Sequence, residues 1–102
     1  MTRLERLQQL AATQPDDPLT HYAIGLELLA QERAAEARDA FNRVLALDSR
    51  YTPALMQRAR AEIKLGLRDA AVATLADGIA AAQAAGDRHA ADEMRKLREA
   101  LG

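Results

Sequence analysis

The chain has 102 residues, a length that fits one compact domain, and its 14 Lys and Arg residues nearly balance 15 Asp and Glu residues. A net charge of −1 argues against binding to nucleic acids or membranes through bulk charge. The absence of cysteine excludes disulfides, thiolate zinc sites and thiol nucleophiles. Alanine is the most frequent residue and only Phe41, Tyr22 and Tyr51 are aromatic, so we expect a thin core built by close contacts between helices.

Strong helix formers fill the N-terminal half of the chain between regularly spaced breaks. Asp17 precedes Pro18, an arrangement typical of an N-cap followed by proline in the first helical turn. A similar pair, Thr52 and Pro53, predicts that Thr52 caps the fourth helix. The first three helices are predicted at about Thr2–Thr13, Pro18–Ala30 and Ala34–Leu47.

Glycines separate the helices of the C-terminal half. Gly66 and Gly86 suit left-handed C-terminal stops, and Asp87 can cap the helix that follows. Gly78 is expected to loosen the middle of the fifth helix. The last three helices are predicted at about Pro53–Leu65, Arg68–Ala84 and Arg88–Leu101. Since no segment alternates between apolar and polar residues, the protein is predicted to be all-α.

The sequence repeats itself with a period of about 34 residues. Sliding it by this step places small residues on small ones, as with Gly25 and Ala59, and large residues on large ones, as with Phe41 and Leu75. Each period contains two helices, which indicates a stack of antiparallel hairpins. Gly25 would allow close approach of a facing helix, and Phe41 would fill the space between successive hairpins.

The pattern His21-x-x-Ile24-Gly25-x-x-Leu28 followed by Ala37-x-x-x-Phe41 resembles the tetratricopeptide repeat family. Ser49 stands at the position of the closing proline of the family's signature, and the second repeat is looser. There, Arg58 and Glu62 occupy positions that are usually apolar, and Gly78 replaces a small residue similar to alanine. The resemblance implies a short right-handed α-solenoid of six helices, with a generic helical bundle as the alternative.

Residues 1–102 are therefore expected to form a single domain. Its four parts are an N-terminal half-repeat helix at residues 1–17, a first repeat at 18–51, a second repeat at 52–85 and a C-terminal capping helix at 86–102.

The resemblance also implies a function, a non-catalytic adaptor that binds a peptide or protein segment on a concave face lined by the first helix of each hairpin. Tyr22 is expected to supply rigid contact area and Arg60 to hold a carboxylate, so the face suits a peptide with a hydrophobic anchor and a nearby carboxylate. The side chains expected on this face are Leu19, Tyr22, Leu26, Leu29, Met56, Arg60, Ile63 and Lys64.

A second interpretation stays open for the same residues. Tyr22, Leu26 and Leu29 can instead be covered by the sixth helix or by a second copy of the chain, in which case the protein is an assembly subunit that forms a homodimer through this face. Two and a half repeats are near the minimum for a stable stack, which favours self-association.

One partner known for the family, the acidic tail of chaperones, is not expected here. Some tetratricopeptide proteins grip such tails with Lys, Asn and Arg side chains on the inner helices. Tyr22, Leu26 and Gln57 stand at three of the matching positions, and the first two do not provide the required donors to carboxylates.

No pattern in the sequence predicts catalysis, a cofactor or a metal. The only histidines, His21 and His89, do not form a HExxH motif, and Ser49 is not part of a nucleophile elbow. Basic side chains on the sixth helix, Arg88, Arg95, Lys96 and Arg98, are interpreted as favourable partners of the helix C-terminus and of the carboxylates of Asp92 and Glu99 rather than as a nucleic-acid site.

Composition also bears on location and source. No targeting signal and no apolar span long enough for a membrane is visible, so we expect a cytoplasmic protein whose partner is another protein. The bias toward alanine and arginine, with 12 Arg against 2 Lys, points to a bacterial genome rich in GC.

Overall fold

A computed structural model describes residues 1–102 and consists of six α-helices without any strand. With 79% of its residues helical, the chain is all-α, as predicted. The bounds of the second, third and fifth helices coincide with the predicted ones. The helices are α1 (Arg3–Thr13), α2 (Pro18–Ala30), α3 (Ala34–Leu47), α4 (Thr52–Lys64), α5 (Arg68–Ala84) and α6 (Arg88–Ala100).

Side-chain caps start three of these helices. The Asp17 carboxylate accepts a hydrogen bond from the Leu19 amide at 3.0 Å, and Asp87 accepts one from the Ala90 amide at 3.0 Å, which confirms both predicted caps. Thr2 lies outside α1 and forms a reciprocal capping box with Glu5, so α1 begins at Arg3 rather than at Thr2.

The predicted cap at Thr52 is wrong. Tyr51 is the N-cap of α4, and Thr52 is already helical because the Ala54 and Leu55 amides donate to the Tyr51 carbonyl at 3.0 and 3.2 Å. The Thr52 hydroxyl donates backward to the Arg50 carbonyl and caps nothing. Two ends also shift by one position, since α4 ends at Lys64 and α6 at Ala100.

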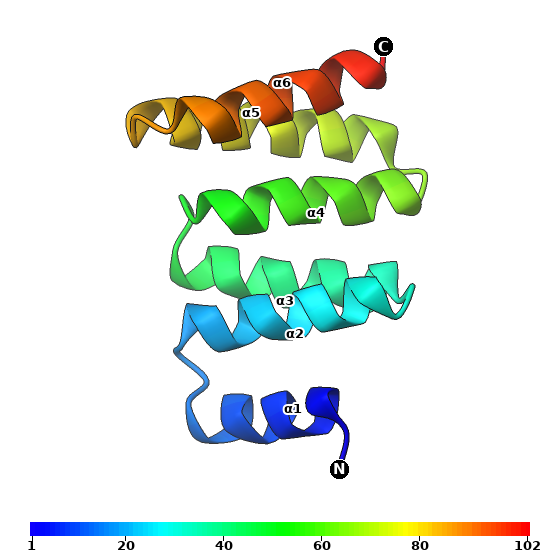
Figure 1. The fold of residues 1–102 in the computed structure, drawn as a ribbon, viewed down its shortest axis with the longest axis vertical. Coiled ribbons are helices and arrows are strands. Elements are labelled where there is room, and N and C mark those ends of the chain that lie inside the picture. Colours follow the sequence, from blue (N-terminus) through cyan, green and yellow to red (C-terminus); the bar gives the residue numbers. More distant parts are fainter.

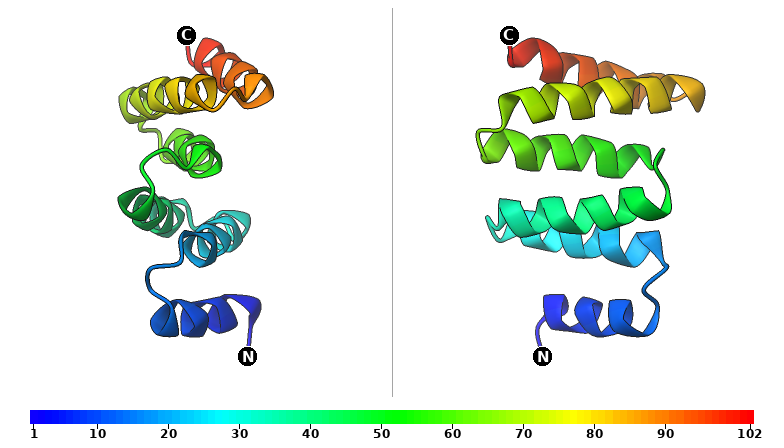
Figure 2. Two further views of the ribbon diagram at one scale, coloured as in Figure 1. Left: turned by 90° about the vertical axis from the view of Figure 1, so that its left-hand side faces the viewer. Right: turned by 180° about the vertical axis from the view of Figure 1, so that it is seen from behind.

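The helices form an elongated stack of two layers that measures 41 × 28 × 19 Å. The N-terminus lies at one end of the stack and the C-terminus at the other (Figure 1). The side view in Figure 2 places α2, α4 and α6 in one layer and α3 and α5 in the other. Each helix packs on its neighbours along the chain, the arrangement of a helical-repeat solenoid.

Left-handed backbone closes the loops after α2, α4 and α5. Gly66 and Gly86 both have a φ of 74°, which confirms the predicted stops. Glu32, which lies one repeat before Gly66, has a φ of 62° and is the only non-glycine residue with positive φ. A side chain in this conformation costs about 1–2 kcal/mol.

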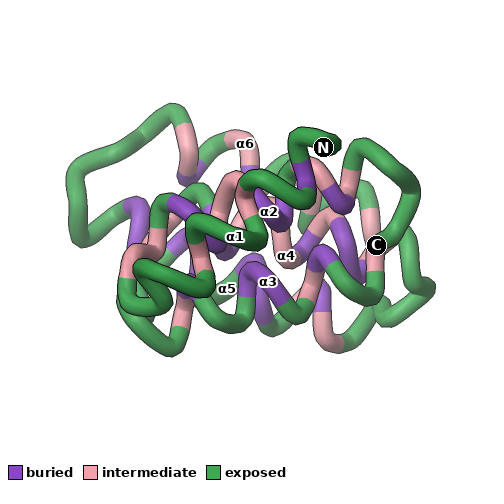
Figure 3. Tube along the Cα trace, turned by 90° about the horizontal axis from the view of Figure 1, so that it is seen from below, coloured by how far each residue is buried: buried purple, intermediate pink, exposed green.

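Buried side chains form two hydrophobic clusters inside the stack. Figure 3 marks the buried positions along the chain in purple. The first cluster contains Leu4, Ile24, Leu28, Ala37, Ala40, Phe41, Val44 and Ala54, and therefore joins α1, α2 and α3 to the first turn of α4. The second cluster contains Ala59, Leu75, Ile79, Ala82, Ala91 and Met94, and joins α4, α5 and α6.

Two glycines allow the close approach of helices that these small clusters require. A methyl group at Gly25 would overlap the ring of Phe41, which is fully buried. A methyl group at Gly78 would overlap the sulfur of Met94, which is also fully buried. Gly78 therefore receives α6 within an uninterrupted α5, and the expectation that it loosens this helix is wrong.

Truncation of Phe41 tests the role of the largest buried side chain. Phe41→Ala is expected to lower the free energy of unfolding by about 3–5 kcal/mol, because it removes a buried ring and leaves a cavity against Gly25. Urea titration followed by circular dichroism measures the change, with the exposed Leu47→Ala as control. A loss below about 1 kcal/mol would show that the ring does not hold the first cluster together.

The strained turn after α2 gives a second prediction. Glu32→Gly is expected to raise the free energy of unfolding by about 1 kcal/mol, because glycine adopts positive φ without a steric penalty. The lost contact with Lys64, 3.5 Å between exposed groups, contributes little. Gly66→Ala at the matching turn is the control and should destabilise the chain by a similar amount; thermal unfolding of both variants checks the opposite signs.

Candidate protein-binding surface

Four side chains of α2 form a stripe that the core does not cover. Leu19 is 62% exposed and Leu26 is 38% exposed, while Tyr22 and Leu29 are half-buried. Residues at these spacings lie on one face of a helix. The stripe consists of apolar and aromatic side chains that remain in contact with solvent.

Tyr22 lies at the point where this stripe meets the next hairpin. Its ring packs at tilted angles against Phe41 and Tyr51, with centroids 5.9 and 5.6 Å away. Burial of the phenol raises the pKa of Tyr22, nearby Tyr51 raises it further, and Arg60 and a hydrogen bond with Gln57 oppose the shift. Side chains from α2, α3 and α4 thus surround one aromatic ring.

The four residues of α4 expected beside this stripe also remain accessible. Met56, Arg60 and Ile63 are half-buried. Lys64 is exposed and its ammonium lies 3.5 Å from a Glu32 carboxylate oxygen. Arg60 lies near enough to Tyr22 to affect its titration, so a cation and an aromatic ring occur together at this place.

The sixth helix does not cover the stripe on α2. α6 packs on α5 at the C-terminal end of the stack, while α2 lies toward the other end (Figure 1). Thus one of the two covers considered from the sequence is not formed. All eight residues expected on the face are at least partly exposed in the single chain.

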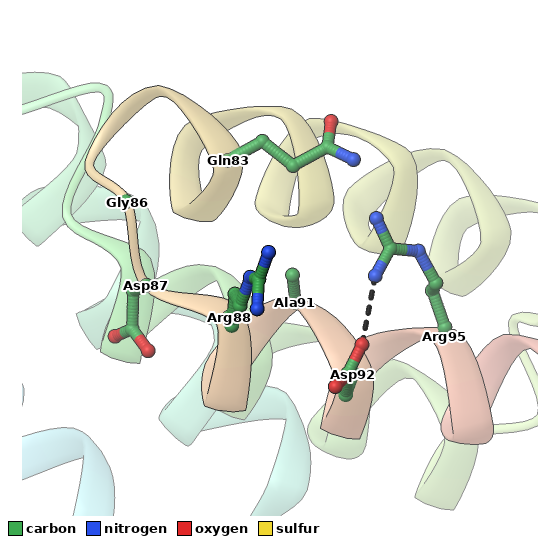
Figure 4. A pocket seen from close by; sticks show the side chains of 7 residues that line it. All are labelled: Gln83, Gly86, Asp87, Arg88, Ala91, Asp92 and Arg95. Carbon is green, nitrogen blue, oxygen red and sulfur yellow. Dashed lines mark hydrogen bonds and ion pairs between the residues drawn. The ribbon is translucent and has the colours of Figure 1, made fainter.

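A hollow of about 540 Å³ lies between α6 and the C-terminal end of α5. Figure 4 shows Arg88, Ala91 and Arg95 on α6 reaching toward α5, where Gln83 lies across the opening. The Arg95 guanidinium pairs with Asp92 at 2.9 Å. This pair agrees with the interpretation that carboxylates of α6 neutralise its basic side chains, although no ion pair joins Glu99 to them.

The two histidines lie far from each other. His21 is buried and its Nε2 donates to the Pro15 carbonyl at 2.8 Å, while exposed His89 pairs with Glu93 at 3.0 Å. No group of three or more His, Asp and Glu side chains is arranged to hold a metal ion. No helix is long and apolar enough to cross a membrane.

Solved structures share this arrangement of helices, whereas no protein-family model and no curated protein matches the sequence. A protein from Bordetella parapertussis solved in solution is 25% identical, with a TM-score of 0.86 over 99% of this chain and 88% of that one. A tetratricopeptide repeat domain protein from Salinibacter ruber is 26% identical, with a TM-score of 0.78 over 85% of this chain and 88% of that one.

A third similar structure is the first tetratricopeptide repeat domain of Spaghetti (RPAP3), solved bound to the HSP90 peptide SRMEEVD. It is 20% identical, with a TM-score of 0.81 over 96% of this chain and 76% of that one. The chain is a small tetratricopeptide-repeat-like protein. The two bacterial neighbours are consistent with the bacterial source that the composition indicated.

Sequence reasoning does not identify Tyr51 and Gln57 as neighbours of Tyr22. The sequence marks Tyr51 only as one of three aromatic residues, and Gln57 only as the residue at one position of the chaperone-tail clamp. Tyr51 immediately precedes α4 and Gln57 lies in its second turn. Stacking of the second hairpin on α2 would bring both near Tyr22, and this is the signal in the sequence that could have identified them.

Titration of Tyr22 tests this packing. Because its pKa is raised in the folded chain, the phenol stays protonated at a pH where it would ionise in the unfolded chain. Its contribution to stability is present below the unfolded pKa of about 10 and is lost as pH rises through the folded pKa. Ultraviolet titration should show a component above the ordinary tyrosine range that Tyr22→Phe removes; its persistence in this variant would contradict the packing described for Tyr22.

Proposed function

We propose that the chain is a non-catalytic interaction module that binds a segment of another protein across α2 and α4, on the concave side of the solenoid. The observation that carries the proposal is the accessible stripe of Leu19, Tyr22, Leu26 and Leu29, which runs beside Arg60. Exposed leucines next to a partly desolvated aromatic ring and a cation are typical of a binding surface.

The chemistry of this surface favours a partner with an apolar anchor and a carboxylate. The edge of the Tyr22 ring and Leu26 offer apolar contact area that needs no reorganisation of the core. The Arg60 guanidinium forms no ion pair within the chain and can bind a carboxylate through two parallel N–H bonds. The partner segment therefore carries an acidic group close to its apolar side chain.

The peptide-bound domain of RPAP3 supports the general role and not the same ligand. It shares the fold of this chain and binds a peptide, so the scaffold is suited to such a role. Tyr22 and Leu26 stand where a chaperone-tail clamp would need side-chain donors to carboxylates. We therefore infer a less acidic and more hydrophobic ligand than SRMEEVD.

The test is an affinity capture from lysate of the source organism, with wild type compared with Tyr22→Asp/Arg60→Glu. The double variant should lose the bound partner by about tenfold or more, because it charges the apolar contact and reverses the cation. Circular dichroism must show that the variant keeps its helices. Peptides selected from a random library should carry a bulky apolar residue followed by Asp or Glu.

A matched control makes the same two kinds of substitution, an apolar residue to Asp and an Arg to Glu, on a different helix. Leu47→Asp/Arg43→Glu lies on α3, where both residues are exposed, and should retain the partner. Sedimentation of the wild type identifies the alternative: a dimer that only Tyr22→Asp dissociates means that a second copy occupies the surface. Identical captures by all three proteins would move the binding site to another face.

A further inference from the structure

A polar contact lies at the centre of the interface between the two hairpins. Glu62 of α4 is only 1% exposed, and one of its carboxylate oxygens accepts a hydrogen bond from Nε of Arg38 at 2.8 Å and forms an ion pair with Nη2 of the same guanidinium, also at 2.8 Å. The other oxygen accepts a hydrogen bond from the Thr74 hydroxyl at 2.6 Å. One carboxylate thus joins α3, α4 and α5.

A second polar contact lies one helical turn away along the same two helices. Arg58 donates through Nη1 to the Asn42 side-chain oxygen at 3.0 Å, and its Nε is buried without a partner. Because α3 and α4 run antiparallel, the pairs Asn42–Arg58 and Arg38–Glu62 lie in sequence along one interface. We call these four residues, together with Thr74, the polar seam.

The preceding repeat is apolar at four of the five corresponding positions, and the exception is the exposed Gln8, one repeat before Asn42. One repeat before Glu62, Arg58 and Thr74 stand Leu28, Ile24 and Ala40, all of which are buried in the first cluster. The same step leads from Arg38 to Leu4, which is also buried in that cluster. The interface between α1 and α2 therefore has two leucines where that between α3 and α4 has an ion pair.

The seam interrupts the apolar interior of the solenoid. Residues of α1, α2 and α3 form the first hydrophobic cluster, which includes only Ala54 of α4, whereas Ala59 of α4 belongs to the second cluster. Apolar contact is non-directional, and small flat alanines permit one hairpin to rotate or slide on another. Hydrogen bonds to a buried carboxylate form only within narrow limits of distance and angle.

We propose that Glu62 is a positioning residue that fixes the orientation of the α4–α5 hairpin on the α2–α3 hairpin, and with it the separation of α2 and α4. The Arg38 and Thr74 side chains hold the carboxylate from two different helices, so only one arrangement of the hairpins satisfies both oxygens. Exchange of such a buried ion pair for apolar side chains is commonly neutral or stabilising, so the seam supplies orientation rather than stability.

The test uses the variant Arg38→Leu/Glu62→Leu, which copies the Leu4 and Leu28 pair of the first interface. Since the chain has no native cysteine, spin labels on introduced cysteines at the exposed positions Gln9 and Lys96 report the distance between the two ends of the stack. Pulsed electron paramagnetic resonance should show that the distance distribution of the double variant is broader than that of the wild type by about 1.5-fold or more. Its urea midpoint should be equal to or higher than that of the wild type.

Two controls distinguish a change in the orientation of the hairpins from a general loosening of the fold. Labels at Asp69 and Lys96 lie within the second half of the chain and should keep the same distribution in both proteins. The variant Arg33→Leu/Glu36→Leu removes an exposed ion pair of α3 and should leave the 9–96 distribution unchanged.

An unchanged 9–96 distribution in the stable double variant would overturn the proposal, because apolar contacts would then suffice to orient the hairpins. Broadening of both label pairs together would also overturn it, since a loosened fold explains that result. If the double variant does not fold, Thr74→Val removes one of the two supports of the carboxylate at constant shape. The 9–96 distribution of this variant should broaden, and a distribution equal to that of the wild type would contradict the role of Glu62.

Discussion

The close approach of paired helices is the constraint on which the rest of this structure depends. Alanine-rich helices bury little apolar area per residue, so their packing is favourable only where backbones come near one another. Gly25 makes this possible against Phe41, and Gly78 does so against Met94. In each contact, a glycine of one helix lies against a large, fully buried side chain of a neighbouring helix.

This packing also determines which surface is left over. In α2, the residues facing α3 are committed to the first cluster, whereas Leu19 and Leu26 of the stripe are exposed and Tyr22 and Leu29 pack against that cluster. α6 packs on α5 at the C-terminal end of the stack and does not cover the stripe. Tyr22 belongs to both environments, with its ring packed against Phe41 and also near Arg60. Core packing therefore determines which residues of the candidate surface can be substituted without loss of the fold.

Local signals predicted most of the helices, and contacts between distant residues account for the errors. Asp17 and Asp87 act on amides within the first turn of the helix that each caps, so their caps could be predicted from neighbouring residues alone. Thr52 has the same local pattern but lies inside α4, because the Tyr51 carbonyl already accepts the first helical bond. Gly78 was misinterpreted since its partner Met94 belongs to the next helix, whose placement the sequence does not specify. The candidate surface could be predicted as a set of residues on two helices, but the contacts of Tyr22 with Tyr51 and Gln57 needed coordinates.

Two departures of the second repeat from the family pattern have a common physical explanation. Taken singly, Arg58 and Glu62 look like weak positions of a degenerate repeat. In the structure Glu62 forms one network with Arg38 and Thr74, and Arg58 forms the adjacent contact with Asn42. A carboxylate at position 62 is acceptable only because α3 and α5 both supply donors to its oxygens. The second repeat is therefore not a weakened copy of the first but a hairpin whose contact with its neighbour is made by directional polar bonds.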